Sequence, residues 1–530
     1  MSNHQQPDRP NTSGISRRTM LAAAAVAVPA SALAASPASA APVATKPSRT
    51  TPAAVGRLFD KIEAGMAKYA IPGAGLGVWY RGREYVRGFG VTSVDNPSPV
   101  TADTVFRIGS TSKTFTATVI MQLVERGLVH LDRPVRAYLP DFATADPTVG
   151  PRVTVRQLLN HTAGWRGDTF VDTGDGDDAL ARYVAALSAA PQLTPVGKVF
   201  AYNNAAIGVA GRIIEVVTGK PYETAARQML IDPLGLAHSR FFRSELGGFS
   251  VAASHNVVDG KAVVEPAFDA MPRSLHSFGG LISSAHDQLR YARFQLGHHG
   301  FPRLLRDRTR VAMQSNPGPG GTLFVELDGV GVGWMIRPTA EGVKVIQHGG
   351  DWSGQHSGFL MVPKRDFALT VLTNSESGPA LTAELFADDW ALAELAGVHN
   401  LPAVQRPLTP RQLAPYEGRY VASQVGVDGV ESSFALDLTG DHGQLLASVE
   451  GQPALRFGFY RRDYVLSLGL DGTPDHVRAN FVPGHDGRPA FLRYGGRLYR
   501  RQTTAARSAA NRAAATRPLT SFAALTSPVR

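Results

Sequence analysis

A serine and a lysine lie three residues apart in the segment from Phe106 to Phe115, Phe-Arg-Ile-Gly-Ser-Thr-Ser-Lys-Thr-Phe. The apolar residues that follow recur at helical spacing, so Ser110 and Lys113 are predicted to lie at a helix start and to point the same way. A serine hydroxyl is a weak nucleophile, and an adjacent amine can take its proton and stabilise the alkoxide. Because Ser-x-x-Lys also arises by chance, its meaning depends on the rest of the chain.

Two later motifs give the serine and lysine a context: Tyr202-Asn203-Asn204 and His348-Gly349-Gly350. Alone, the first would more often be a turn and the second part of a half-buried strand. In this order, Ser-x-x-Lys, Tyr-x-Asn and His-x-Gly resemble the signature of serine β-lactamases, penicillin-binding proteins and their esterase, D-aminopeptidase and D-Ala-D-Ala carboxypeptidase relatives. The resemblance covers roughly residues 55 to 395. Further segments similar to this family are 127–134, 153–164 and 278–287.

The resemblance implies a catalytic group without metal or cofactor. Ser110 would attack a carbonyl and form an acyl-enzyme, while Lys113 would share its proton. Tyr202 would act as a general base or proton shuttle, because a phenol flanked by ammonium groups loses its proton more easily. The backbone N–H groups of Ser110 and Asp351 would form the oxyanion hole.

The resemblance also implies a substrate-binding group. Asn204 would donate to the substrate, and Gly350 beside His348 would leave room for it along a strand. True β-lactamases usually carry Lys-Thr-Gly where this chain has His348-Gly349-Gly350. Histidine is mostly neutral at pH 7 and binds a carboxylate less strongly, which favours esters, D-amino-acid amides and peptides, or transacylation. Asn203 also departs from the commoner serine. His161 is interpreted as a structural residue that fixes a loop.

The resemblance indicates an exported serine hydrolase that cleaves peptide, amide or ester bonds, with D-configured substrates favoured. A β-lactamase-like esterase and a peptide-cyclising transacylase are alternatives within the same chemistry. A non-catalytic penicillin-binding or sensor protein is the alternative of another class. The expected partner is a small-molecule or peptide substrate. The oligomeric state is left open.

The pattern of the body predicts an α/β (α+β) fold with a mainly antiparallel sheet, helices and an inserted helical domain, over residues 55–400. Two short strands are expected around the turn Arg81-Gly82. Residues 411–501 alternate polar and apolar residues in short strands and are predicted to form a small β-barrel. Its opening, Tyr416-Glu-Gly-Arg-Tyr420, resembles the lipocalin-like barrel of some family members, and a stabilising role is favoured over a catalytic one. Residues 502–530 are expected to form a disordered tail.

The first forty residues resemble a bacterial twin-arginine export signal. Ser16-Arg17-Arg18-Thr19-Met20-Leu21 precedes an Ala-rich apolar run, and Ala38-Ser39-Ala40 offers a cleavage site before Ala41. The apolar run is short and Ala-rich for a membrane span, so no stable membrane insertion is expected after the signal is removed. Residues 41–54 read as a linker, and the enzyme is expected to act outside the cytoplasm.

Composition narrows the function classes further. The formal net charge of +10 is concentrated at the two ends of the chain, and the body between them is close to neutral, which argues against nucleic acid as a partner. The absence of cysteine excludes disulfides, thiolate metal sites and cysteine nucleophiles. The acidic stretch Asp172–Asp178 lacks the closing glutamate of a calcium loop. No metal site is expected.

Overall fold

An antiparallel seven-stranded sheet forms the centre of the N-terminal domain, which extends from residue 53 to residue 396. The computed structural model describes residues 51–266, 271–315 and 317–502, so the predicted export signal and the tail beyond residue 502 lie outside it. The strands follow the order β2 (Arg83–Gly90), β1 (Gly73–Tyr80), β13 (Phe367–Thr373), β12 (Gln355–Val362), β11 (Val345–Trp352), β10 (Met335–Arg337) and β9 (Gly329–Val330). Both chain ends of the domain contribute strands, as the sequence predicted.

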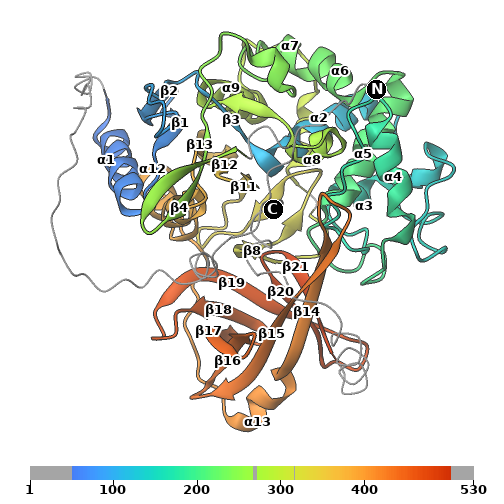
Figure 1. The fold of residues 1–530 in the computed structure, drawn as a ribbon, viewed down its shortest axis with the longest axis vertical. Coiled ribbons are helices and arrows are strands. Elements are labelled where there is room, and N and C mark those ends of the chain that lie inside the picture. The colour runs from blue at the N-terminus through green and yellow to red at the C-terminus, as the bar shows by residue number, and fades with distance from the viewer. Residues whose placement is uncertain (1–50, 267–270, 316, 503–530) are drawn as a thin grey trace, which may run out of the picture.

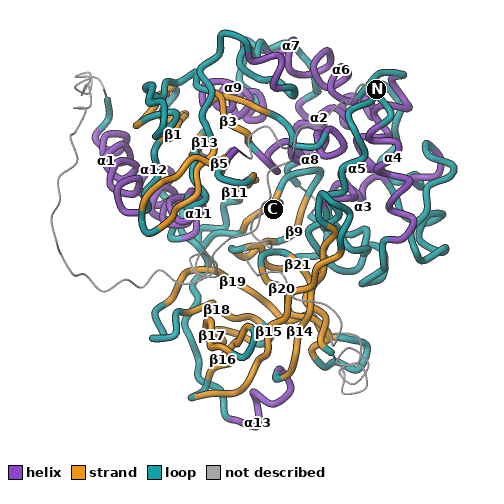
Figure 2. Tube along the Cα trace, in the orientation of Figure 1, coloured by secondary structure: helices purple, strands orange, loops and turns teal. Residues whose placement is uncertain are grey.

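Helices cover both faces of this sheet (Figures 1 and 2). On one face, α1 (Ala53–Lys68) and α12 (Trp390–Ala396) pack with α11 (Gly378–Thr382) against the sheet. On the other face lies α9 (Ala285–Leu296), and beyond it α2 (Ser112–Glu125). Because helices cover both faces of the sheet, every residue of β1 is buried. A strand that is buried on both faces is expected to have a continuous apolar sequence.

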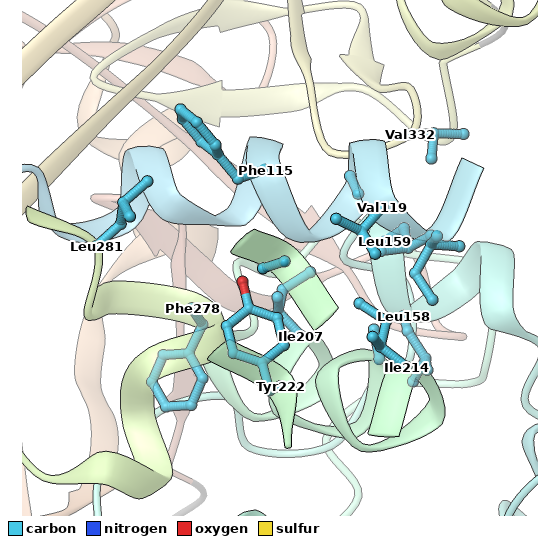
Figure 3. Packing of buried hydrophobic residues seen from close by; sticks show 14 of the residues in the cluster. Phe115, Val119, Leu158, Leu159, Ile207, Ile214, Tyr222, Phe278, Leu281 and Val332 are labelled. Atoms are coloured by element: carbon cyan, nitrogen blue, oxygen red, sulfur yellow. The ribbon is translucent and has the colours of Figure 1, made fainter. Parts of the chain in front are cut away.

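Helices α2 and α5 (Asn204–Thr218) lie at the centre of the helical region. Helix α2 is buried over its whole length up to Leu123, and Figure 3 shows Phe115 and Val119 among the apolar side chains around it. The remaining helices are α3 (Val155–Leu159), α4 (Ala179–Ala186), α6 (Tyr222–Ala226), α7 (Asp232–Leu234), α8 (His276–Gly279) and α10 (Asp307–Met313). Because α2 follows Ser110 directly, its tight packing fixes the position of the Ser-x-x-Lys motif.

Three pairs of short strands connect these layers. They are β3 (Val105–Arg107) with β6 (Ile282–Ser284), β4 (Ser254–Val258) with β5 (Lys261–Glu265), and β7 (Gly321–Leu323) with β8 (Val325–Leu327). Strand β3 leads directly into the 3-10 turn η1 (Gly109–Thr111), which carries Ser110.

The C-terminal domain is a closed antiparallel barrel of eight strands, drawn in orange and red in Figure 1. The short helix α13 (Pro410–Leu413) precedes it. Its strands are β14 (Gly418–Val425), β15 (Glu431–Asp441), β16 (Gln444–Val449), β17 (Gln452–Arg461), β18 (Tyr464–Leu468), β19 (Pro474–Pro483), β20 (Pro489–Tyr494) and β21 (Arg497–Arg501). The barrel has its own apolar core, so the predicted fold class is confirmed in both parts.

The barrel docks on the N-terminal domain through an apolar cluster and through polar and backbone contacts. Glu326 of β8 accepts a hydrogen bond of 2.8 Å from the Tyr460 hydroxyl and pairs with Arg478 at 3.4 Å. The backbone N–H of Arg478 donates to the carbonyl of Phe324 at 2.7 Å. Glu326 and Arg478 are both buried, so these contacts make a specific interface.

Candidate active site

Ser110 and Lys113 are in direct contact. The Lys113 Nζ donates to the Ser110 Oγ at 2.8 Å and to the carbonyl oxygen of Phe278 at 2.7 Å. Lys113 is completely buried, and this burial, helped by the positive charge of Arg497, holds its pKa well below the usual range. A buried amine of this kind is uncharged more often than a surface lysine and has a lone pair available for a proton.

Two glycines allow the backbone around Ser110 to lie against strand β11. Gly109 has a φ of +49°, and a Cβ at this position would lie 2.6 Å from the backbone nitrogen of Asp351. A Cβ on Gly350 would lie 2.4 Å from the backbone nitrogen of Ser110. A side chain at either position would therefore push the two segments apart. The structure brings together the two backbone segments that carry the predicted oxyanion-hole donors.

The side chain of Tyr202 lies close enough to Ser110 for the serine to lower the pKa of the phenol. Its ring lies between two other groups of the site, with the Lys113 Nζ 5.2 Å from the ring centroid and the His161 ring stacked at 4.6 Å. Burial raises the pKa of Tyr202 above its ordinary value, although Ser110 and Arg497 oppose the shift. This direction is opposite to the easier proton loss expected from the sequence, because desolvation outweighs the neighbouring positive charge. Tyr202 is a protonated phenol in the resting site.

Tyr202 is held in place by the residues next to it in the chain. The Asn203 side chain caps α5 by accepting from the backbone N–H of Ala206 at 2.8 Å. The backbone N–H of Asn203 donates to the Nδ1 of His161 at 3.0 Å, and His161 itself has a φ of +58°. These contacts agree with the structural interpretation of His161. They also explain why asparagine serves at position 203, since it is among the preferred N-cap residues.

Asn204 forms a hydrogen bond with a residue that was not predicted from the sequence to belong to the site. Its Nδ2 donates to the Asp168 Oδ1 at 2.7 Å, and both residues are buried. The amide of Asn204 is therefore fixed at the edge of the site, with its orientation set by a carboxylate.

His348 lies buried on β11, with 3% of its surface exposed. Its Nδ1 makes a 2.7 Å hydrogen bond with the carbonyl of Gly349, which requires Nδ1 to carry the proton. Its Nε2 has no hydrogen-bond partner within the described part of the chain. Burial is the main cause that lowers the pKa of His348 to about 3, and a proton on Lys113 has a smaller effect in the same direction. The residue is neutral at physiological pH, so it supplies no fixed positive charge for a substrate carboxylate.

A hairpin of the barrel reaches this site. Gly496, in the turn between β20 and β21, accepts a hydrogen bond of 2.9 Å from the backbone N–H of Tyr202. Gly496 has a φ of +75°, and a Cβ there would lie 2.3 Å from the Leu323 Cδ1. The next residue, Arg497, places its guanidinium 5.1 Å from the centroid of the Tyr202 ring. The barrel is thus part of the wall of the site, which goes beyond the stabilising role favoured from the sequence.

Comparison with known proteins places this geometry in a family. The family model described as Beta-lactamase matches residues 58–394. The chain belongs to the β-lactamase family. The resemblance predicted from the sequence is confirmed, and the chain is a serine hydrolase of this family.

Relatives of the β-lactamase family extend the likeness beyond the N-terminal domain. Penicillin-binding protein 4 of Amycolatopsis lactamdurans is 35% identical over 368 residues, which cover 68% of this chain and 96% of that protein. The crystal structure of SurE is 30% identical, with a TM-score of 0.66, and the match covers 85% of this chain and 98% of that one. The octameric penicillin-binding protein homologue from Pyrococcus abyssi is 26% identical, with a TM-score of 0.55 over 80% of this chain. The SurE match is longer than the N-terminal domain, so it includes barrel residues.

Within residues 51–266, 271–315 and 317–502, no group of three or more His, Cys, Asp or Glu side chains is placed to hold a metal ion. Among the helices that the structure describes, none combines the length and the apolar character needed to cross a membrane.

Proposed function

We propose that the chain forms an acyl-enzyme on Ser110 and cleaves peptide, amide or ester bonds, with substrates that contain D-amino acids favoured. The observation that carries the proposal is the 2.8 Å contact between the Lys113 Nζ and the Ser110 Oγ, with the lysine pKa lowered by burial. A neutral amine in hydrogen-bond contact with a hydroxyl is the arrangement that activates a serine nucleophile.

The proton steps follow from the protonation states. Ser110 gives its proton to the neutral Lys113 as its Oγ bonds to the substrate carbonyl carbon. The negative charge on the former carbonyl oxygen is stabilised by the backbone N–H groups of Ser110 and Asp351. Tyr202, kept protonated by burial, donates its proton to the leaving nitrogen or oxygen as that bond breaks, and regains one from Lys113. Water then releases the acyl group by the reverse sequence.

The neutral state of His348 supports the choice of substrates. A carboxylate-binding lactamase or carboxypeptidase gains from a permanent cation on this strand, and His348 with a pKa of about 3 does not provide one. Glycine at position 349 avoids a tight contact, since a Cβ there would lie 3.1 Å from the Ser357 carbonyl oxygen. Uncharged esters and D-aminoacyl amides therefore suit this strand better than anionic lactams.

Intact-protein mass spectrometry tests the proposal. The protein is exposed separately to a fluorophosphonate, a penicillin, a p-nitrophenyl ester and a D-aminoacyl p-nitroanilide, and the modified residue is mapped. We expect covalent adducts on Ser110, with release of p-nitrophenol and p-nitroaniline. Adducts that form but never turn over would favour the non-catalytic penicillin-binding or sensor protein. Adducts on another residue would contradict the assignment.

Transfer of the acyl group to an amine is a second candidate. It is supported by the barrel hairpin, because Gly496 and Arg497 lie against Tyr202 and can contribute to binding a second substrate there. Adding a free D-amino acid or its amide during ester turnover tests it. Products coupled to the amine would favour transacylation, and only the free acid would favour hydrolysis.

Export before function is also proposed, on sequence grounds alone. It is supported by the pair Arg17-Arg18 before an Ala-rich run and by the cleavage pattern Ala38-Ser39-Ala40, all outside the described residues. Expression in a bacterium with and without a twin-arginine translocase, followed by N-terminal mass analysis, tests it. A mature protein that starts at Ala41 only when the translocase is present is the expected result.

A further inference from the structure

A large cavity lies between the barrel and the N-terminal domain, immediately beside the candidate active site. Its volume is about 1840 Å³, and residues of both domains line it. The N-terminal domain contributes the segments 165–168 and 193–202 to its wall, and the barrel contributes β14, β21 and the turn between β19 and β20. Tyr202, Asp168 and Arg497 are part of this wall, so the cavity lies against three residues of the candidate site, although Ser110 itself does not line it. We call it the interdomain cavity.

The volume of the interdomain cavity indicates a substrate larger than a simple ester. Pockets for drug-sized molecules usually measure about 300–1,000 Å³. A small acyl amide would leave most of the 1840 Å³ unfilled. A peptide segment of several residues is the kind of ligand that fills such a volume.

The charges of the side chains that line the interdomain cavity favour a peptide with negative charge. The basic side chains that line the cavity outnumber the carboxylates. Those basic residues are Arg166, Lys198, Arg488, Arg497, Arg500 and Arg501, and the carboxylates are Asp168, Glu417 and Asp486. Two of the basic residues are already paired, Arg497 with Asp168 at 2.9 Å and Arg166 with Glu431 at 2.7 Å. Lys198, Arg488 and Arg500 have no ion-pair partner among the described residues and are exposed to the cavity and solvent.

Buried polar atoms on the same wall are also without partners. Among the described residues, the Nε of Arg166 and the Oγ1 of Thr194 have no hydrogen-bond partner. Arg166 is 8% exposed and Thr194 is 4% exposed. Both atoms are covered by protein, and the Arg166 Nη1 already binds Glu431 at 2.7 Å, so a ligand in the cavity meets the exposed basic side chains instead.

We propose that the interdomain cavity binds the remote part of an anionic peptide substrate, one that carries carboxylates several residues from the bond cleaved at Ser110. This inference rests on the function proposed above and adds the substrate class. Basic side chains around a cleft with low-dielectric walls raise the local concentration of anionic ligands and speed their association. Because His348 is neutral, the positive charge that attracts such a substrate comes from the barrel side rather than from β11.

A charge-swap experiment tests the proposal. One p-nitrophenyl ester of acetyl-D-alanine serves as the short substrate. Longer esters carry a four-residue arm that is acidic, neutral or basic, attached to the acyl side in one series and to the leaving alcohol in another. For wild type we expect kcat/KM to be about tenfold higher for the acidic than for the neutral arm in one series. The difference should shrink in high salt, because charges near solvent are screened.

The double variant Arg488→Glu, Arg500→Glu should reverse the preference, so that the basic arm becomes the better substrate relative to the neutral arm. The matched control is Arg303→Glu, Arg462→Glu, which makes the same change of charge at two exposed arginines that do not line the cavity. It should keep the wild-type preference. Each comparison is a ratio within one protein, so a general loss of activity does not obscure it.

The outcomes separate the two proposals. No charge preference in either series, with the short ester still turned over, would overturn the substrate class and leave the proposed function intact. The same preference in both double variants would also overturn it, since the charge would then act from elsewhere. Failure of every substrate, including the short ester, would contradict the proposed function itself.

Discussion

Arg497, on the last strand of the barrel, forms an ion pair of 2.9 Å with Asp168 of the N-terminal domain, 329 residues earlier in the chain. Asp168 also holds the amide of Asn204, and Arg497 lies over the ring of Tyr202. The pair therefore links the barrel to two residues of the candidate site. It also sets the electrostatic environment of Lys113, whose pKa is lowered by Arg497 and raised by Asp168.

This arrangement predicts opposite pH effects for two neutralising substitutions. The acid limb of the rate profile reports the loss of the proton from Lys113, because only the neutral amine accepts the serine proton. Arg497→Gln should raise the Lys113 pKa and move this limb to higher pH, whereas Asp168→Asn should move it to lower pH. The profile of kcat/KM for a neutral ester is the measurement.

Arg497→Lys keeps the charge and is the control for that experiment, so its limb should stay near that of wild type. Arg497→Gln should also destabilise the protein by about 2–3 kcal/mol, because it leaves the buried carboxylate of Asp168 without its cationic partner. If the acid limb moved in the same direction in Arg497→Gln and in Asp168→Asn, Lys113 would not be the titrating group.

Ser110→Ala should abolish covalent labelling and reduce turnover by several orders of magnitude, as the removal of a nucleophile does. The thermal midpoint should change little, because one partly exposed oxygen is lost at the edge of the site. Intact mass after fluorophosphonate treatment and steady-state rates with an ester are the measurements. Retention of more than about a hundredth of the wild-type rate would mean that another nucleophile acts.

His348→Lys should favour anionic lactams. A lysine here places an ammonium group where family relatives hold a carboxylate, and acylation by penicillin should rise about tenfold relative to a neutral ester. Parallel acylation rates with penicillin and with a p-nitrophenyl ester are the measurement. Equal changes for both would show that His348 is structural and that the argument from its neutrality fails.

The buried state of His348 also predicts a pH dependence of stability. Its pKa is about 3 in the folded protein and near its ordinary 6.5 when unfolded, so the unfolded chain binds more protons between these values. The contribution of neutral, buried His348 to the free energy of unfolding is present above pH 6.5 and is lost as the pH falls toward 3. The loss amounts to about 2 kcal/mol between pH 6.5 and 5. Unfolding of wild type and His348→Gln at both pH values should show a smaller decrease for the variant.

A pair of glycines separates contact from backbone strain in the barrel. Gly496 and Gly487 have φ values of +75° and +74°, so alanine at either costs about 1 kcal/mol in backbone energy. Around Gly487 there is open space, whereas a Cβ on Gly496 meets Leu323 and the Tyr202 Cβ at 2.3 and 3.1 Å. Gly496→Ala should therefore lower both the thermal midpoint and kcat, and Gly487→Ala only the midpoint. Equal kcat values would mean that the hairpin contact has no part in catalysis.

The parts of the fold set by local pattern were predictable from the sequence. The hairpin around Arg81-Gly82 forms because both turn residues adopt positive φ, as a tight two-residue connection requires. The order of the motifs around Ser110, Tyr202 and His348 was enough to expect one site, and the structure brings all three together.

The remainder depends on burial and domain docking, which no local pattern records. The sequence suggested an easier proton loss for Tyr202 from its charged neighbours, but the degree of burial decides the direction and could not be read from spacing. Asp168 lies outside every motif, and Arg497 lies in a strand of ordinary alternation. Their pairing arises only when the barrel docks, so neither residue could be assigned to the site in advance.

The hairpin that carries Gly496 and Arg497 has a consequence for the biosynthesis of the enzyme. A ribosome makes the N-terminal domain first, and domains generally fold as units in that order. The site lacks its final wall until residue 497 has emerged and β21 has closed the barrel. Prematurely terminated chains would therefore fold a sheet that contains Ser110 and Lys113 but lacks the neighbours of Tyr202. We therefore expect full reactivity only from chains long enough to include β21.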